Sequence, residues 1–270
     1  MGAGVAWSER AVERDGVRLV CRDWGGSGQP VVLLHGLAGH AGEWDALAQR
    51  LSPRFRVVAV DQRGHGAGER HPRDVSRAAY VADVAAVIGR LALERPVLVG
   101  QSLGGHTAML TAAAHPELVR GLVLVESGAG GPSPDTPATI GSWLDSWPTP
   151  FPSREAAAAF LGGGPVGAGW AAGLEEREDG WWPRFDRDVM VGSLAENAQR
   201  SFWSEWERVM CPTLLVLAQS SFLPEREAEE MLRRRPATRA LCVPGTHHDL
   251  HLEQPGVLHT VLLDFLGGLA

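Results

Sequence analysis

The chain has 270 residues, 44% of them hydrophobic, and a formal net charge of −7, which suits one large globular domain or one core with a sizeable insertion. All 25 basic residues are arginine, and without lysine neither a Walker phosphate loop nor a pyridoxal phosphate enzyme can be built. The acidic balance argues against nucleic acid as a partner. Because the sequence has no secretory signal and no apolar run of membrane-spanning length, we expect a cytoplasmic protein with no membrane partner.

Short apolar runs alternate with helical patterns over the first half of the chain. The runs at 31–34, 55–60, 97–99 and 122–125 are typical of strands buried on both faces, and 17–22 alternates like a half-buried strand. Apolar residues recur at helical spacing over 43–51, 77–93 and 103–115. This alternation predicts an α/β fold with a mostly parallel, doubly wound sheet that helices cover on both faces.

The pattern breaks after the strand that ends at Glu126. The stretch 128–210 is rich in glycine and proline and holds seven of the ten tryptophans. The sheet pattern then resumes with strands at 213–217 and 241–243 and helices at 225–234 and 257–266. We therefore predict a core made of 1–127 and 211–270, with a helical cap (a lid) of residues 128–210 inserted between them.

The strongest chemical signal is GQSLGG at 100–105, which lies between a predicted strand and a predicted helix. A serine with glycine two residues before and two residues after it, in that context, is typical of a nucleophile elbow, where a strained turn exposes the hydroxyl. The helix that follows directs its first N–H groups and positive dipole end toward developing negative charge. Ser102 is therefore the candidate nucleophile.

A second signal is HGLAG at 35–39, at the end of the predicted strand 31–34. Here the backbone has to leave the strand sharply and can present an N–H group to an oxyanion. The backbone N–H groups of Leu37 and Leu103 are the candidate oxyanion hole. The alternative for this segment is a plain glycine turn between a strand and a helix.

With these motifs the chain resembles the α/β-hydrolase superfamily, and in particular its serine hydrolases of esterase or lactonase type with an inserted lid. Members share a strand-end HG turn, a DxRGxG segment, a GxSxG elbow and a late histidine. The corresponding segments here are HGLAG (35–39), DQRGHG (61–66), GQSLGG (100–105) and GTHHDLHLEQP (245–255). They follow the superfamily's order, so the resemblance implies the fold and a serine nucleophile, but it does not name the substrate.

The resemblance also selects the catalytic base. Superfamily members carry Glu-x-Pro a few residues after the histidine, and alignment on Glu253-Gln254-Pro255 selects His248. The adjacent His247 stays as the alternative, because geometry decides which imidazole reaches the serine. His251 is expected to begin a helix. The cluster of His247, His248, Asp249 and His251 lacks a recognised zinc-binding spacing, so we expect no metal ion.

The acid departs from the commonest superfamily pattern. Its usual segment reads Ala218-Gln219-Ser220-Ser221 here, with serine in the expected acidic position. Some members carry the acid one strand earlier, where Glu126 is the carboxylate. An acceptor at that position can hold the imidazole in one tautomer and stabilise the imidazolium, so Glu126 is the candidate. The alternative for Glu126 is a hydrogen-bonded carboxylate at the hinge into the insertion.

Two other segments are assigned no chemistry. DQRGHG at 61–66 is expected to be structural, with Asp61 and Arg63 making charge-assisted hydrogen bonds. GGGPVG at 162–167 matches a dinucleotide-binding pattern, but it follows a helical stretch and contains proline, so no cofactor is expected. The three cysteines lie in apolar stretches and are expected to be buried thiols.

The tryptophan-rich insertion bears on the substrate. Tryptophan offers a large, rigid apolar surface, and Trp143, Trp147, Trp181 and Trp203 are the candidate substrate contacts. These observations favour a serine hydrolase that cleaves a carboxylic ester, lactone or thioester of a small to medium apolar or aromatic molecule through an acyl-enzyme. The alternatives are a C–C bond hydrolase, a cofactor-free lyase or an acyltransferase on the same triad, or a non-catalytic ligand receptor. The sequence leaves the oligomeric state open.

Overall fold

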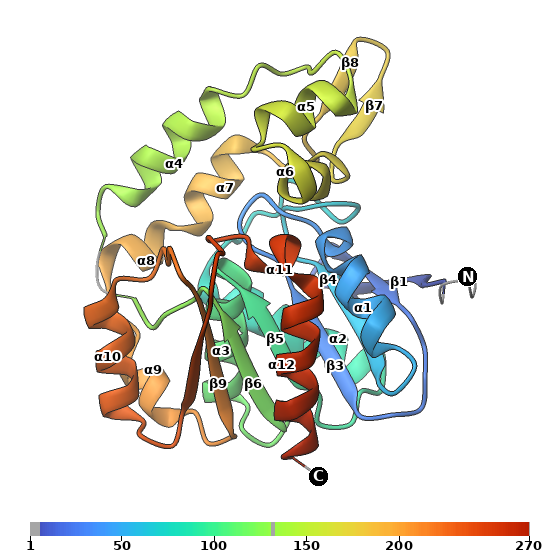
Figure 1. Cartoon of the computed structure of the whole chain (residues 1–270). Helices are drawn as coiled ribbons and strands as arrows, with labels where there is room; N and C mark the ends of the chain where they lie inside the picture. Colours follow the sequence, from blue (N-terminus) through green and yellow to red (C-terminus); the bar gives the residue numbers. More distant parts are fainter. Residues whose placement is uncertain (1–5, 131–132, 270) are drawn as a thin grey trace.

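An eight-stranded sheet runs through the molecule in the order β1-β2-β4-β3-β5-β6-β9-β10 (Figure 1). The computed structural model describes residues 6–130 and 133–269. The strands are β1 (Ser8–Arg14), β2 (Val17–Asp23), β3 (Pro30–Leu34), β4 (Arg56–Asp61), β5 (Val97–Gln101), β6 (Gly121–Val125), β9 (Thr213–Ala218) and β10 (Arg239–Val243). Strand β2 pairs antiparallel with β1 and β4, and every pair from β4 to β10 is parallel. The predicted α/β fold with a mostly parallel sheet is confirmed.

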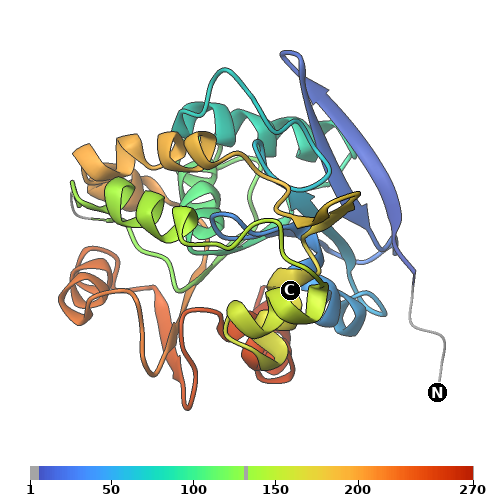
Figure 2. The same ribbon diagram turned by 90° about the horizontal axis from the view of Figure 1, so that it is seen from above.

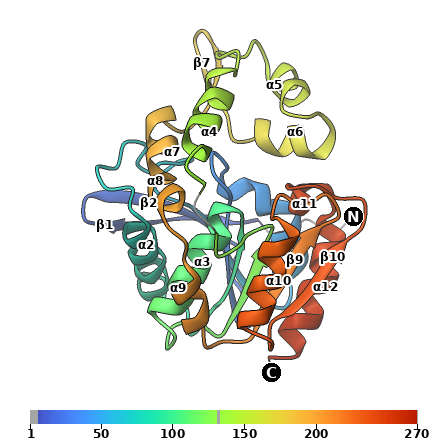
Figure 3. The same cartoon turned by 90° about the vertical axis from the view of Figure 1, so that its left-hand side faces the viewer.

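Helices cover both faces of the sheet, which is why its central strands are continuous apolar runs (Figure 3). One buried cluster joins the sheet to the short 3-10 helix η1 (Ala41–Trp44), α1 (Asp45–Leu51), α11 (Leu250–Glu253) and α12 (Pro255–Gly267). The cluster on the other face includes α2 (Arg77–Arg90), α3 (Leu103–Ala114), α9 (Trp203–Arg208) and α10 (Glu225–Arg234).

A smaller layer lies beyond the carboxyl ends of the parallel strands (Figures 1 and 2). It consists of α4 (Thr136–Asp145), α5 (Arg154–Phe160), α6 (Gly164–Ala171), β7 (Glu175–Arg177), β8 (Gly180–Trp182), α7 (Arg187–Ser193) and α8 (Ala195–Gln199). These elements share a separate apolar cluster that includes Trp147, Phe151 and Met190. This cluster also takes in Ala38 from the loop after β3. We propose that the layer is the expected cap.

Helix α9 belongs with the sheet rather than with this layer. Trp206 and Phe202 are fully buried in the cluster that contains α3, and the Trp206 indole N–H donates to the Met231 carbonyl oxygen on α10 at 2.9 Å. We therefore propose that the cap ends near residue 200, about ten residues before the expected boundary at 210.

Two features differ from the sequence expectations. Strand β1 was not predicted, because only Val12 of its seven residues is buried and the strand therefore shows no apolar alternation. Cys242 is exposed, which makes the expectation of three buried thiols wrong for this residue; it lies on β10, the edge strand, whose residues are mostly open to solvent. Cys21 and Cys211 are buried, and burial raises the pKa of their thiols to about 12 and about 11.

Candidate active site

The turn between β5 and α3 is strained at its serine. Ser102 has φ 50° and ψ −118°, a conformation that costs a side-chain-bearing residue about 1–3 kcal/mol. A Cβ on Gly100 would lie 2.3 Å from the carbonyl oxygen of Gly104, and a Cβ on Gly104 would lie 2.3 Å from that of Leu34. The Ser102 N–H donates to the carbonyl oxygen of Val125 on β6 at 3.0 Å. Glycine thus permits the close approach, and the sheet holds the strained residue.

The oxyanion turn (residues 35–39) is held by two buried imidazoles. The Ala38 N–H donates to His65 Nε2 at 3.1 Å, and the Gln62 N–H donates to His35 Nε2 at 3.1 Å. Both rings therefore carry their proton on Nδ1, which faces a backbone carbonyl oxygen. Burial lowers the pKa of His65 to about 4 and the pKa of His35 well below its usual 6.5. Both rings stay neutral at pH 7, so each can accept one of these hydrogen bonds.

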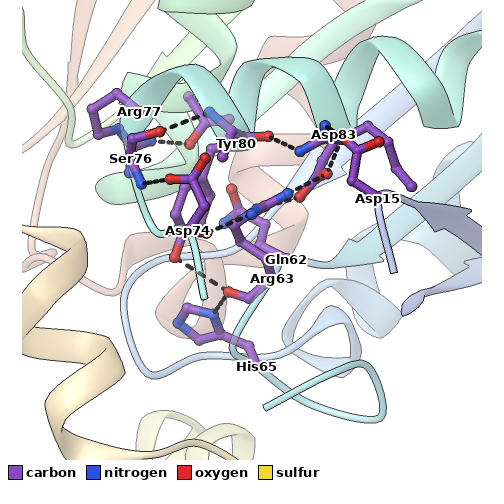
Figure 4. Close-up of polar contacts among 12 residues, drawn as sticks. Asp15, Gln62, Arg63, His65, Asp74, Ser76, Arg77, Tyr80 and Asp83 are labelled. Atoms are coloured by element: carbon purple, nitrogen blue, oxygen red, sulfur yellow. Dashed lines mark hydrogen bonds and ion pairs between the residues drawn. The ribbon is translucent and has the colours of Figure 1, made fainter. Parts of the chain in front are cut away.

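A buried ion pair fixes the DQRGHG segment (residues 61–66), which lies against this turn. Arg63 Nε and Nη2 reach the two carboxylate oxygens of Asp83 on α2 at 2.6 and 2.7 Å (Figure 4). The Tyr80 hydroxyl donates at 3.2 Å to the Arg63 carbonyl oxygen, the same oxygen that His65 contacts. Asp61 instead accepts two backbone N–H groups, at 2.7 and 2.9 Å. The DQRGHG segment therefore supports the oxyanion turn, with Asp61 and Arg63 bound to different partners.

Glu126 is buried just after β6 and binds several donors. Its Oε1 accepts from the Ala218 N–H at 2.7 Å and the Ser221 hydroxyl at 2.8 Å, and its Oε2 accepts from the Phe222 N–H at 2.8 Å. His248 Nδ1 lies 3.6 Å from Oε2. Burial alone would raise the pKa of Glu126, but the neighbouring His248 and the three hydrogen-bond donors outweigh it and lower the pKa. The carboxylate is therefore ionised at neutral pH and faces the imidazole.

Ser221 stands where superfamily members more often carry the acid, and it is hydrogen-bonded to Glu126. Its hydroxyl donates to the Glu126 carboxylate, which follows the neighbouring strand β6. It also accepts from the Leu223 N–H at 3.1 Å, which orders the turn after β9. Ser221 therefore supplies a hydrogen-bond donor to the Glu126 carboxylate.

The two adjacent histidines face different carboxylates. His247 Nδ1 lies 3.5 Å from Glu253, and the side chain of His247 is 72% exposed. His248 faces Glu126, and its carbonyl oxygen accepts from Gln101 Nε2 at 3.1 Å, which ties the histidine loop (residues 244–253) to the residue before Ser102. The structure therefore brings His248, Glu126 and the elbow together, and it places His247 at the surface.

The cap contacts both loops of the site through α6. His40 Nε2 lies 3.0 Å from the carbonyl oxygen of Gly169, and the Trp170 indole N–H donates to Asp249 at 3.3 Å. A Cβ on Gly169 would lie 2.6 Å from the end of the Leu252 side chain, so α6 packs closely on the histidine loop here. The cap is therefore positioned by the loops that carry the oxyanion turn and the histidine.

Three cap tryptophans form one aromatic cluster. Trp147 packs edge-on against Trp143 at 5.3 Å and Trp170 at 6.1 Å between ring centroids. Trp147 also lines a cavity of about 480 Å³, together with Leu144 and Phe185 among others. A second hollow, between the cap and the oxyanion turn, is lined by Ala38, Trp147 and Trp170 among others.

The other two expected substrate contacts, Trp181 and Trp203, lie in different clusters. Trp181 packs against the same cap cluster as Trp147, pairs through its backbone with Phe151 and carries Arg154 over its ring at 5.4 Å. Trp203 packs against the core cluster with Arg234 over its ring at 4.8 Å. The structure thus places Trp143 and Trp147 in ring contact, with Trp181 on the same cluster, and separates Trp203 from them.

A buried carboxyl group that no motif marked connects the oxyanion turn to the histidine loop. Glu43 Oε2 lies 3.4 Å from His251 Nε2, and a Cβ on Gly39 would lie 2.8 Å from both Glu43 oxygens. The His251 ring packs against Trp44 at 4.8 Å. Burial raises the pKa of Glu43 to about 8 and lowers the pKa of His251 to about 4. At neutral pH both are therefore uncharged, and the protonated carboxyl can donate to the imidazole.

Backbone sterics mark the elbow in the sequence, and the family resemblance selected His248. His35 and His65 lie inside the HG and DQRGHG segments, but nothing in these motifs shows which N–H groups they bind. Glu43 has no motif of its own, and its role depends on which loops the fold brings together. Within residues 6–130 and 133–269, no three His, Cys, Asp or Glu side chains are grouped as metal ligands would be.

Comparison with known proteins assigns the chain to a family. Residues 31–260 match the alpha/beta hydrolase family, and the chain belongs to it. It is 29% identical to 2-(acetamidomethylene)succinate hydrolase of Mesorhizobium japonicum over 89% of both chains. It is 28% identical to a putative 2-succinyl-6-hydroxy-2,4-cyclohexadiene-1-carboxylate synthase of Bacillus subtilis, over 93% of this chain and 96% of the relative.

A solved structure agrees with this assignment. The crystal structure of E-2-(acetamidomethylene)succinate hydrolase superposes with a TM-score of 0.87 at 25% identity, over 97% of this chain and 99% of that one. The relatives named as hydrolases support a hydrolase that acts on a small molecule. Within the described part of the chain, no helix has the length and apolar character needed to cross a bilayer.

Replacing Glu126 by Gln is expected to lower kcat for p-nitrophenyl acetate by about 10²- to 10⁴-fold, because His248 loses the anion that fixes its tautomer. Ser221→Ala removes only one donor to the carboxylate and is expected to lower kcat by about tenfold or less. Steady-state kinetics of both variants, with circular dichroism to check folding, tests this. A folded Glu126→Gln variant with full kcat would contradict the role of Glu126.

Replacing Glu43 by Gln is expected to make stability less sensitive to pH. The pKa of Glu43 is about 8 in the folded state and near its ordinary value of 4.5 in the unfolded chain, so raising the pH through this window lowers the free energy of unfolding. Relative to Glu43→Gln, the wild type should lose up to about 1.4 kcal/mol of unfolding free energy per pH unit between about pH 5 and 8. Urea unfolding across this range measures it, with the exposed Glu178→Gln as control. A constant difference between wild type and Glu43→Gln would refute the buried, protonated carboxyl.

Proposed function

We propose that this protein is a serine hydrolase that cleaves a carboxylic ester, lactone or thioester through an acyl-enzyme. The observation that carries the proposal is the strained backbone of Ser102 at the start of α3. Backbone strain of this kind is concentrated at functional sites. Here it presents the Ser102 hydroxyl at the amino-terminal end of α3, where the first N–H groups have no intrahelical partner. The ionised Glu126 beside His248 supports the same assignment.

In the proposed mechanism Ser102 attacks the substrate carbonyl carbon while His248 accepts the hydroxyl proton. Glu126 holds the imidazole in one tautomer and stabilises the imidazolium. The backbone N–H groups of Leu37 and Leu103 bind the oxyanion, a contribution of about 3–4 kcal/mol per donor in such sites. His248 then protonates the leaving group, and water, deprotonated by His248, releases the acyl group from the serine.

The proposed substrate is a small to medium molecule with an apolar or aromatic part. Trp143 and Trp147 are the proposed contacts, since their rings cluster in the cap and Trp147 lines both hollows there. Trp181 and Trp203 are assigned to packing within the cap and core instead. The cavity of about 480 Å³ has the size that such ligands need, and its lining mixes Trp147, Leu144 and Phe185 with charged side chains such as Arg70 and Asp186.

A cofactor-free lyase is the second candidate. It is favoured by the similarity to the Bacillus subtilis relative, which is named as a putative synthase rather than a hydrolase. The same histidine and carboxylate would then remove a proton from carbon, and the oxyanion hole would stabilise an enolate. In that case the serine hydroxyl is activated but no acyl-enzyme forms from simple esters.

The wild type is expected to react with a fluorophosphonate probe and to hydrolyse p-nitrophenyl acetate and butyrate, and Ser102→Ala is expected to lose both properties. Ser142→Ala, a change of the same kind on the exposed face of α4, should keep both. Probe labelling by mass spectrometry and release of p-nitrophenolate measure the outcome. Labelling without ester turnover would favour the lyase. A folded wild type that is not labelled would contradict the proposal that Ser102 is an activated nucleophile.

A further inference from the structure

The turn after β9 (residues 219–224) holds one large apolar side chain open to solvent. Phe222 is 71% exposed, although the next residue, Leu223, is buried in the core. The Phe222 N–H donates to Glu126 Oε2 at 2.8 Å, and the same oxygen faces His248. The Glu126 carboxylate therefore fixes the backbone of this turn, while the aromatic ring of Phe222 is left outside the core.

The ring of Phe222 lies against the imidazole of His248. The two ring centroids are 5.0 Å apart and the ring planes are tilted by 53°, a distance at which aromatic rings attract one another. The side chain of His248 is itself 35% exposed, so Phe222 covers only part of it. An apolar surface that is open to solvent thus stands directly beside the proposed catalytic base.

Two hydrogen bonds fasten the turn after β9 to the histidine loop. The Ser220 N–H donates to the Thr246 carbonyl oxygen at 3.0 Å. The Gly245 N–H donates to the Gln219 side-chain oxygen at 2.7 Å. The turn and the loop follow the neighbouring parallel strands β9 and β10, at the edge of the sheet that the cap layer faces (Figure 1). These contacts hold the aromatic ring beside the imidazole.

We propose that Phe222 binds the leaving group of the substrate, and that the enzyme prefers esters or thioesters whose alcohol or thiol part is apolar or aromatic. This inference rests on the proposed function and narrows its substrate class. In that mechanism His248 protonates the leaving oxygen or sulfur, which therefore lies about 3 Å from the imidazole. The next atoms of the leaving group come within reach of the aromatic ring, where an apolar group is removed from water.

The position of Phe222 also separates the two parts of the substrate. The acyl chain and the leaving group occupy different bonds of the carbonyl carbon, and only the leaving group has to approach His248 for protonation. Phe222 should therefore discriminate among leaving groups and not among acyl chains. A ring that only shielded His248 from water would instead change the turnover of every ester by the same factor.

The test compares two acetates that differ only in the alcohol, which is aromatic in benzyl acetate and polar in 2-methoxyethyl acetate. The wild type is expected to prefer benzyl acetate in kcat/KM by about five- to twentyfold, the effect of one apolar aromatic contact. Phe222→Ala keeps the backbone N–H to Glu126 and should reduce this preference to about twofold or less. Phe222→Tyr retains the ring and should restore it. A preference that is unchanged in Phe222→Ala would overturn the proposal.

Two controls separate a leaving-group contact from a general effect on the site. Phe160→Ala removes the same ring from an exposed position on the cap helix α5 and should keep the preference for benzyl acetate. Methyl butyrate and methyl acetate share a leaving group, so their kcat/KM ratio should be equal in the wild type and in Phe222→Ala. An equal loss of turnover on benzyl acetate and 2-methoxyethyl acetate in Phe222→Ala would assign the ring to shielding and overturn the leaving-group contact.

A second measurement needs no ester turnover. Benzyl alcohol is expected to bind the wild type, seen by NMR as saturation transfer from the protein, and to bind Phe222→Ala about fivefold more weakly. Equal transfer from both proteins would refute the contact. If neither acetate is hydrolysed but the difference in binding is present, the proposed function fails while the contact stands. If the wild type hydrolyses both acetates with equal kcat/KM, the contact fails while the proposed function stands.

Discussion

The close approach of α3 to the sheet is the constraint on which the rest of the site depends. The first turn of the helix lies against β3 and β5 at a distance that excludes any Cβ on Gly100 or Gly104. This approach places Ser102 in a backbone conformation that costs free energy, and the hydrogen bond to β6 keeps it there. The proposed oxyanion donors and His248 have to lie beside this serine. Buried polar groups hold the loops that carry them.

Most of the buried polar groups that hold these loops are uncharged. Neutral buried groups, namely His35, His65 and the Glu43–His251 pair, fix loops where a charge would be too costly. Charge is kept for Glu126, whose ionised carboxylate is stabilised by hydrogen bonds that outweigh its burial. A site arranged in this way needs little reorganisation when charge develops on a substrate, which is how electrostatic preorganisation accelerates reactions.

Much of the fold was predictable, because parallel strands buried on both faces appear in the sequence as apolar runs. The GxSxG pattern adds a steric requirement for glycine on both sides of the serine. The elbow with its flanking strand and helix follows from these two features, whereas His248 was selected by the resemblance to the α/β-hydrolase superfamily. Strand β1 was not predictable, because an exposed edge strand needs no apolar pattern. We propose an earlier end for the cap than the sequence suggested, because Phe202 and Trp206 belong to the tryptophan-rich stretch but pack in the core cluster that contains α3.

We propose that Ser102, His248 and Glu126 act together beside an oxyanion hole. A crystal structure of the protein inactivated by a small alkyl fluorophosphonate tests it most directly. We predict a phosphonyl group on Ser102 Oγ, one phosphonyl oxygen within hydrogen-bond distance of the Leu37 and Leu103 nitrogens, and His248 Nδ1 bonded to Glu126. An adduct on another residue, or His248 turned away from Glu126 in the adduct, would contradict the claim.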